Sequence, residues 1–188
     1  SLLKAYAAAG SDARMNGCEL PVVINSGSGN QGLTVSVPLI VYAEREHLDK
    51  EKLYRALVIS NLTAIHLKTE IGRLSAFCGA VSAGAACGAG LAYLKDASEE
   101  VMNHTIVNAL AITSGIICDG AKASCAAKIA VSVEAGILGY DMYMNGQQFY
   151  GGDGIISKGI ENTIHNIGVL GSQGMASTDQ EIIKIMCE

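Results

Sequence analysis

The chain has 188 residues, 49% of them hydrophobic, which is enough for a single domain with a sizeable core. A formal net charge of −5, without any cluster of Lys and Arg, excludes a nucleic-acid-binding surface. No apolar run reaches the roughly 18–20 residues that span a bilayer, and no secretory signal is evident, so we expect a cytoplasmic protein that does not enter a membrane.

Taken in chain order, the apolar pattern predicts helices over 1–9, 35–46, 50–71, 74–94, 99–116, 122–138, 157–170 and 178–187. Gly10 would end the first helix and Gly139 the sixth, because glycine is common just past a helix C-terminus. Pro38 would lie in the first turn of the second helix, where a missing N–H has no intrahelical partner to lose. Asp49 and Ser98 are placed as N-caps of the third and fifth helices.

Residues 11–34 and 144–154 are predicted as loops, and β-branched residues are only weakly enriched at 20–24 and 34–41. Abundant Ala and 22 Gly indicate helices whose backbones approach one another closely. No repeat of fixed period is present, which argues against a solenoid. The sequence therefore predicts a mostly α fold: one compact domain over 1–188, a bundle of seven or eight helices with a Gly/Ser-rich loop and a Cys-containing helix-turn.

The six cysteines favour a reduced, metal-binding protein, because a core of this size does not need disulfides. In one continuous helix, Cys118 and Cys125 would lie on nearly the same face, about 10 Å apart along the axis. A break at Asp119-Gly120 would shorten that span and place Cys125 at a helix N-terminus, which favours the thiolate. With Cys78 they make three soft ligands, and three ligands leave one coordination position open. Three buried free cysteines fit the spacing equally well, and no role is assigned to Cys18, Cys87 and Cys187.

The segment 25–32 reads Asn-Ser-Gly-Ser-Gly-Asn-Gln-Gly and is a second candidate site. Its backbone N–H groups could cradle a carboxylate or a phosphate. It matches neither a P-loop nor the dinucleotide fingerprint, and the alternative interpretation is a flexible linker. The side chains that could contact a ligand are Asn25, Ser26, Ser28, Asn30 and Gln31.

The other polar residues give weaker signals. Lys68, Glu70 and Arg73 share one helical neighbourhood, where a solvated i,i+3 pair of Glu70 with Arg73 is the favoured interpretation. His66 and His165 lie within apolar helical patterns and are predicted to be satisfied core histidines. No Ser-His-Asp or Cys-His arrangement can be proposed.

Three segments of the chain together resemble the serine dehydratase alpha-chain family, and within it the L-cysteine desulfidase branch. They are 25–32, Phe77-Cys-Gly-Ala80 and the stretch from Cys118 to Lys128. The resemblance covers essentially the whole chain and corresponds to the C-terminal, helical part of a protein about twice as long. It implies an oxygen-sensitive [4Fe–4S] enzyme that works without pyridoxal phosphate. The family's N-terminal cysteine and base-bearing region have no counterpart here, so a missing N-terminal half or a companion subunit is implied, and the activity of this chain alone is in question.

The resemblance also carries residues over. In the desulfidase branch one cysteine is followed after 40 residues by a second and after 7 more by a third, and Cys78, Cys118 and Cys125 reproduce that spacing. They are therefore the implied cluster ligands. The polar side chains of 25–32 are the implied contacts to a small amino-acid substrate.

The function hypothesis is β-elimination from L-cysteine to pyruvate, ammonia and sulfide, with Lys122 and Lys128 as weak candidates for the base. The nearest alternative is dehydration of L-serine on the same fold. Other classes are a non-catalytic module that binds a small anion, and a redox-sensing domain in which Cys118 and Cys125 form a disulfide. A homodimer is also considered.

Overall fold

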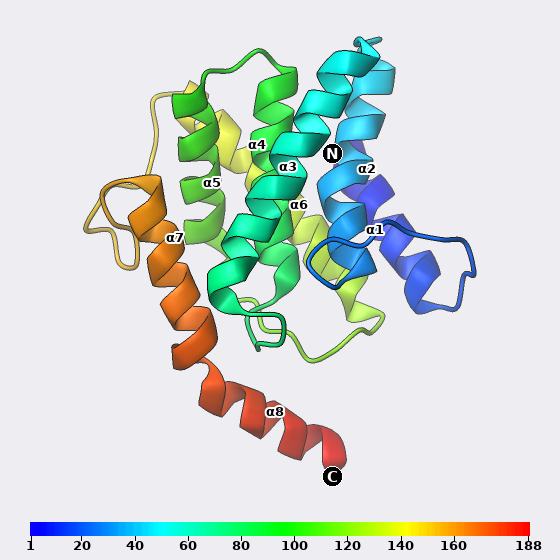
Figure 1. The fold of residues 1–188 in the computed structure, drawn as a ribbon, viewed down its shortest axis with the longest axis vertical. Coiled ribbons are helices and arrows are strands. Elements are labelled where there is room, and N and C mark those ends of the chain that lie inside the picture. The colour runs from blue at the N-terminus through cyan, green and yellow to red at the C-terminus, as the bar shows by residue number, and fades with distance from the viewer.

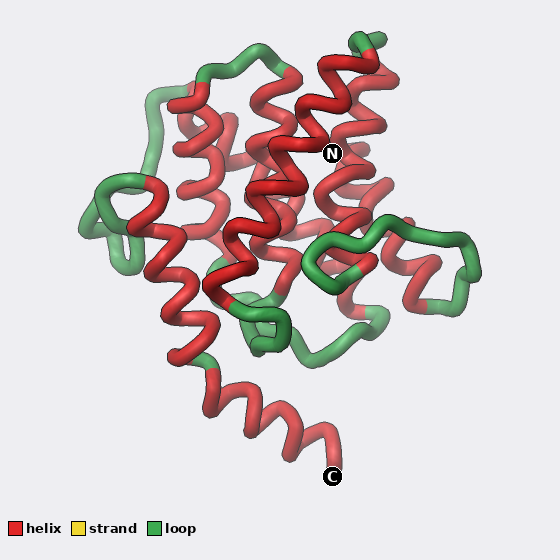
Figure 2. The backbone as a smooth tube through the Cα atoms, in the orientation of Figure 1, coloured by secondary structure: helices red, strands yellow, loops and turns green.

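The structure is a computed structural model that describes all residues from Ser1 to Glu188. It contains eight α-helices, a short π-helical turn and no strand (Figure 2), which confirms the predicted mostly α bundle. The helices are α1 (Leu2–Met15), α2 (Gly29–Arg45), α3 (Lys50–Ile71), α4 (Gly79–Leu94), α5 (Glu99–Thr113), α6 (Ser124–Met144), α7 (Ile160–Val169) and α8 (Ala176–Cys187), with the π-helical turn η1 (Leu170–Gly174) before α8.

Helix α4 is the centre of the bundle (Figure 1). All but two of its residues are buried, and it packs against α2, α3, α5 and α6. A methyl group on Gly84 would stand 2.3 Å from the backbone oxygen of Ser132 in α6, and one on Gly136 would stand 2.4 Å from the oxygen of Gly84. The α4 and α6 backbones are therefore in direct contact, as the small-residue composition predicted.

The two glycines predicted to end helices do not end them. Helix α1 continues through Gly10 to Met15, and α6 continues through Gly139 to Met144. Gly139 lies against α5, where a methyl group would stand 2.7 Å from the backbone oxygen of Thr105. Its small size serves helix packing rather than a C-terminal turn.

Helix starts also differ from the prediction. Helix α2 begins at Gly29 and not near 35, so the second half of the Gly/Ser-rich segment is helical and Pro38 lies in the helix interior. Ser28 caps it, its Oγ accepting from the Gln31 N–H at 3.3 Å. Helix α4 begins at Gly79 rather than 74, and α5 ends at Thr113 rather than 116.

Both predicted N-caps are confirmed. The Asp49 carboxylate accepts from the N–H groups of Glu51 and Lys52 at 3.0 and 3.4 Å. The Ser98 hydroxyl accepts from the N–H of Val101 at 3.4 Å. These bonds satisfy donors that a helix start leaves without partners.

Helix α7 is attached to α3 by two His–Glu pairs. His66 Nε2 lies 2.8 Å from a Glu161 oxygen, and His165 Nδ1 lies 2.9 Å from a Glu70 oxygen. The side chains of His66 and His165 are 51% and 65% exposed, so the prediction of core histidines was wrong. Glu70 pairs with His165 across helices, and not with Arg73 along its own.

Helix α8 projects away from the body of the bundle (Figure 1) and buries none of its residues. None of the helices combines the length and the apolar character that crossing a membrane would require.

Candidate functional site

A cavity of about 300 Å³ lies at the end of the bundle where α2, α4 and α6 begin. Its wall comes from parts of the sequence as far apart as Ser26 and Ile129. All three predicted ligand cysteines line it, together with four of the five predicted polar contacts. The shared members are Cys78, Cys118, Cys125, Ser26, Ser28, Asn30 and Gln31.

A short backbone pairing holds Cys78 beside Cys118. The N–H of Cys78 donates to the oxygen of Ile116 at 3.1 Å, and the N–H of Cys118 donates to the oxygen of Ala76 at 2.6 Å. Phe77 and Ile117 form the bridge between these bonds, and Phe77 is fully buried. Two cysteines 40 residues apart in the sequence are thus fixed by main-chain bonds on either side of a buried aromatic anchor.

Cys125 enters the site from the first turn of α6. The chain turns at Gly120, whose φ of +92° is readily adopted by glycine, and α6 begins at Ser124. The Cys125 sulfur accepts from the Lys122 N–H at 3.4 Å and lies 3.7 Å from the Gly120 oxygen. The break expected at Asp119-Gly120 is therefore present, and Cys125 lies at a helix N-terminus.

The cavity is electropositive. Residues in the first turns of α2, α4 and α6 line it, and the unpaired N–H groups of a helix start carry partial positive charge. Lys68, Arg73 and Lys128 also line it, and no Asp or Glu does. Asp119, outside the lining, forms an ion pair with Lys128 at 2.6 Å. Such a field favours thiolates and bound carboxylates.

The side chains of Cys78 and Cys118 interact, and their pKa values shift in opposite directions. The interaction with Cys78 favours the Cys118 thiolate and lowers the pKa of Cys118 to about 6, with the backbone at Gly120 and the charge of Lys128 assisting against burial. The same interaction, with burial, raises the pKa of Cys78. Cys118 is therefore the thiol that ionises first.

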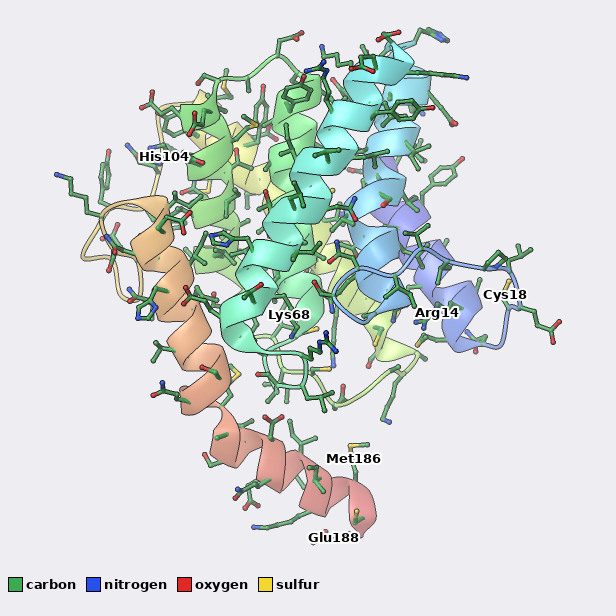
Figure 3. All side chains as sticks on the ribbon, viewed as in Figure 1. Arg14, Cys18, Lys68, His104, Met186 and Glu188 are labelled. Carbon is green, nitrogen blue, oxygen red and sulfur yellow. The ribbon has the colours of Figure 1, made fainter.

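Lys68 is the residue that sequence reasoning missed. It lies on α3 with 6% of its surface exposed and no hydrogen-bond or ion-pair partner within the chain, and Figure 3 shows it at the end of α3 near the loops. Burial lowers the pKa of Lys68, an effect opposed by Cys118, Cys78 and Asp179. A signal was present: Lys68 is four residues after Ala64 and three before Ile71, on the buried side of a helix.

In the polar segment 25–32, some residues line the cavity and others hold the loop in place. Ser26 and Gly27 have φ values of +50° and +83° in a two-residue turn, closed by N–H···O bonds of 3.1 and 3.0 Å between Asn25 and Ser28. Asn25 does not line the cavity: its amide donates to the backbone and side-chain oxygens of Asn61 on α3 at 3.2 and 3.0 Å. It fixes the loop against the bundle.

Two amide side chains at the start of α2 differ in how they are satisfied. The Asn30 oxygen accepts from Arg14 of α1 at 3.1 Å. The Gln31 side chain lies against Gly79, where a methyl group would stand 2.4 Å from its nitrogen, and its Oε1 is buried without a hydrogen-bond partner. A buried acceptor without a partner is costly, so this oxygen is suited to a ligand's N–H.

The cavity lining contains the type of ligand that an iron–sulfur cluster takes. Three cysteines without disulfide partners line the cavity together with cationic side chains, and iron–sulfur clusters are held by cysteine thiolates. No three His, Cys, Asp or Glu side chains converge closely enough to hold a single metal ion.

The remaining candidates lie elsewhere. Lys122 is outside the cavity lining, Cys87 is fully buried in α4, and Cys18 (Figure 3) and Cys187 are exposed. A larger cavity of about 650 Å³ lies between α5 and the loop before α7. It contains no cysteine and none of the predicted site residues, so the cysteine-lined cavity is the candidate site.

Comparison with known proteins identifies the family to which the chain belongs. The family described as "Serine dehydratase alpha chain" matches residues 2–184. The chain belongs to the serine dehydratase alpha-chain family. It is 68% identical over 183 residues to a UPF0597 protein of Desulfitobacterium hafniense, covering 97% of this chain and 43% of that protein. A UPF0597 protein of Lachnoclostridium phytofermentans is 58% identical (97% and 44% covered), and one of Finegoldia magna is 55% identical (100% and 45% covered).

The chain thus spans less than half the length of these relatives. No solved structure matches it.

Proposed function

We propose that this chain is the cluster-binding part of an iron–sulfur-dependent lyase that converts L-cysteine and water to pyruvate, ammonia and hydrogen sulfide. One observation carries the proposal: three cysteines from two separate segments of the chain line a cavity with three cationic side chains and no carboxylate. Membership of the serine dehydratase alpha-chain family supports a lyase.

Cys78, Cys118 and Cys125 would hold the [4Fe–4S] cluster. Bound there, a cluster with one iron free of protein ligands would supply a Lewis acid that eases departure of the substrate's thiol or hydroxyl. Pyridoxal phosphate is not part of the proposal.

Lys68 and Gln31 would orient the amino acid. The Lys68 ammonium has no partner within the chain, and the substrate carboxylate would supply one, assisted by N–H groups at the starts of α2 and α4. The unpartnered Gln31 oxygen would accept from the substrate ammonium. Ser26, Ser28 and Asn30 would shape this side of the pocket.

The elimination requires a base that removes the α-proton while the bond from carbon to sulfur breaks and its electron pair leaves with sulfur. The resulting aminoacrylate reacts with water to give pyruvate and ammonia. Lys128 is a poor base, because its pKa is raised. Desolvation acts to lower the pKa of Lys128, but the bond to Asp119 outweighs that effect. We assign the base to the part of the protein that this chain lacks.

L-Serine is the second candidate substrate, because the family's name refers to serine dehydratase. It would use the same contacts and lose water instead of hydrogen sulfide.

Iron and acid-labile sulfide, measured after anaerobic reconstitution, test the cluster. We expect about four of each per chain, with loss in Cys118→Ala and retention in Cys87→Ala, which removes a buried thiol outside the cavity. Equal iron in both variants would refute the ligand assignment. Competition between L-cysteine and L-serine in the full-length Desulfitobacterium hafniense relative would then identify the substrate.

A further inference from the structure

Helix α8 packs against no other α-helix of the bundle, and the only helical element that it contacts is η1. It has 12 residues and buries none of them. Isolated helices shorter than about 12–15 residues are marginal in water, and most helical stability in proteins comes from packing an apolar face. The helix is therefore expected to be stable only when something covers it.

The sequence of α8 has a face suited to such packing. Ile182, Ile185 and Met186 follow the i, i+3, i+4 spacing of a single helical face. Ile185 and Met186 are 68% and 52% exposed. The opposite side carries Gln180 and Lys184. This apolar face, defined by Ile182, Ile185 and Met186, is the α8 face below.

Helix α8 projects from the same end of the bundle as the cysteine cavity (Figure 1). Asp179 in the first turn of α8 is close enough to act electrostatically on Lys68 inside the cavity. Leu74, which also lines the cavity, is 95% exposed. Figure 3 shows Met186 on the side of α8 that faces the bundle rather than away from it. A body large enough to cover α8 would therefore stand at the end of the bundle that holds the cavity.

We infer that the α8 face is the docking surface for the companion portion of the protein, and that docking covers the mouth of the cysteine cavity. The relatives supply the argument for this occupant: each has more than half of its length outside the region that this chain matches. In each relative that portion is present once for every copy of the matched region, whereas a second copy of α8 would first require self-association. The inference does not depend on which reaction the cavity performs.

The test first compares hydrogen exchange of α8 in this chain with that of the matching helix in the full-length Desulfitobacterium hafniense relative, where both portions are present. Binding is then measured between this chain and the remainder of that relative, produced as a separate polypeptide without the 183 matched residues and used once circular dichroism shows that it is folded. Sedimentation measures the complex, and hydrogen exchange measures protection of residues 176–187. We expect a one-to-one complex in which exchange from α8 slows. Ile185→Asp and Met186→Asp should each weaken binding at least about tenfold, since each places a charge where an apolar side chain would be buried.

Gln180→Asp is the matched control, because it adds the same charge on the opposite side of α8 and should leave affinity within about twofold. No residue of α8 is buried, so these substitutions leave the bundle folded, which circular dichroism verifies. Three results would overturn the inference: no complex, a complex that Ile185→Asp does not weaken, or α8 protection in the chain alone. In the last case a concentration-dependent mass would identify a second copy as the occupant, and a constant mass would show α8 packed on its own bundle. Iron content reports separately on the proposed cluster.

Discussion

Replacing Gly84 by alanine tests the direct contact between the α4 and α6 backbones. The new methyl group would stand 2.3 Å from the Ser132 oxygen, and real contacts of this kind are essentially never below 3.0 Å. The helices must separate by at least about 0.7 Å, and a gap of 0.5–1 Å loses roughly a quarter to a half of each dispersion contact it opens. Overpacking typically costs about 1–3 kcal/mol, and we take about 3 here because a backbone atom cannot turn aside.

Alanine also favours the helical state over glycine by about 1 kcal/mol, so Gly84→Ala should lower the free energy of unfolding by about 2 kcal/mol. For a chain of this size the corresponding fall in Tm is about 4–8 °C. Gly10→Ala is the matched control: it lies inside α1, and its methyl group would make only ordinary contact with Leu33 at 3.5 Å. The free energy of unfolding of the Gly10→Ala variant should therefore rise by the full difference in helix propensity between glycine and alanine, about 1 kcal/mol.

Denaturant unfolding of the two variants against the parent, followed by circular dichroism, measures both effects. The reasoning requires opposite signs. If Gly84→Ala were as stabilising as Gly10→Ala, the α4 and α6 backbones would not be in contact, and the centre of the fold as described would be wrong.

Three further outcomes are expected. In metal-free protein, alkylation of Cys118 by iodoacetamide should have its midpoint near a pH of about 6, because the reactive thiolate persists above that pH and is protonated below it. Cys78→Ala removes the interaction that favours the Cys118 thiolate and should move the midpoint up toward about 8.5. An unmoved midpoint would contradict that interaction. Lys68→Met should raise the Tm of the ligand-free protein by a few degrees, which corresponds to a rise of about 1 kcal/mol in the free energy of unfolding. The same substitution should abolish the stabilisation that an added carboxylate ligand gives the parent, and retained stabilisation would argue against a carboxylate contact. Asp49→Ala should cost about 1 kcal/mol in denaturant unfolding because two helical N–H groups lose their acceptor, and no loss would mean that water replaces the cap.

The sequence predicted local features of the fold well where a residue type has a single structural role. Asp49 and Ser98 accept hydrogen bonds from nearby N–H groups, a purely local interaction, and both caps were found where the sequence placed them. Glycine has two uses, ending a helix and allowing close packing, and sequence cannot separate them. Gly10 and Gly139 were therefore misread, since their roles depend on neighbours from other helices.

The candidate site was predictable in its residue types but not in its assembly. The cysteine spacing and the polar segment were recognisable, yet their meeting in one cavity depends on how α2, α4 and α6 pack. Asn25 could not be distinguished from Gln31 by sequence, because only the fold puts Asn61 beside Asn25 and leaves the Gln31 oxygen without a partner. Lys68 was passed over because a lysine on a helix is usually solvated, and its burial follows from tertiary contacts.

The convergence of three helix starts on one cavity has a consequence for its charge. Lysine and arginine side chains can be neutralised by pH, modification or substitution, but the dipoles of the peptide units cannot. Even with Lys68, Arg73 and Lys128 all replaced, the backbone would still present positive potential to whatever enters. Part of the preference for anions is therefore independent of side-chain identity, and sequence divergence among the lining cations could proceed without reversing the sign of the site.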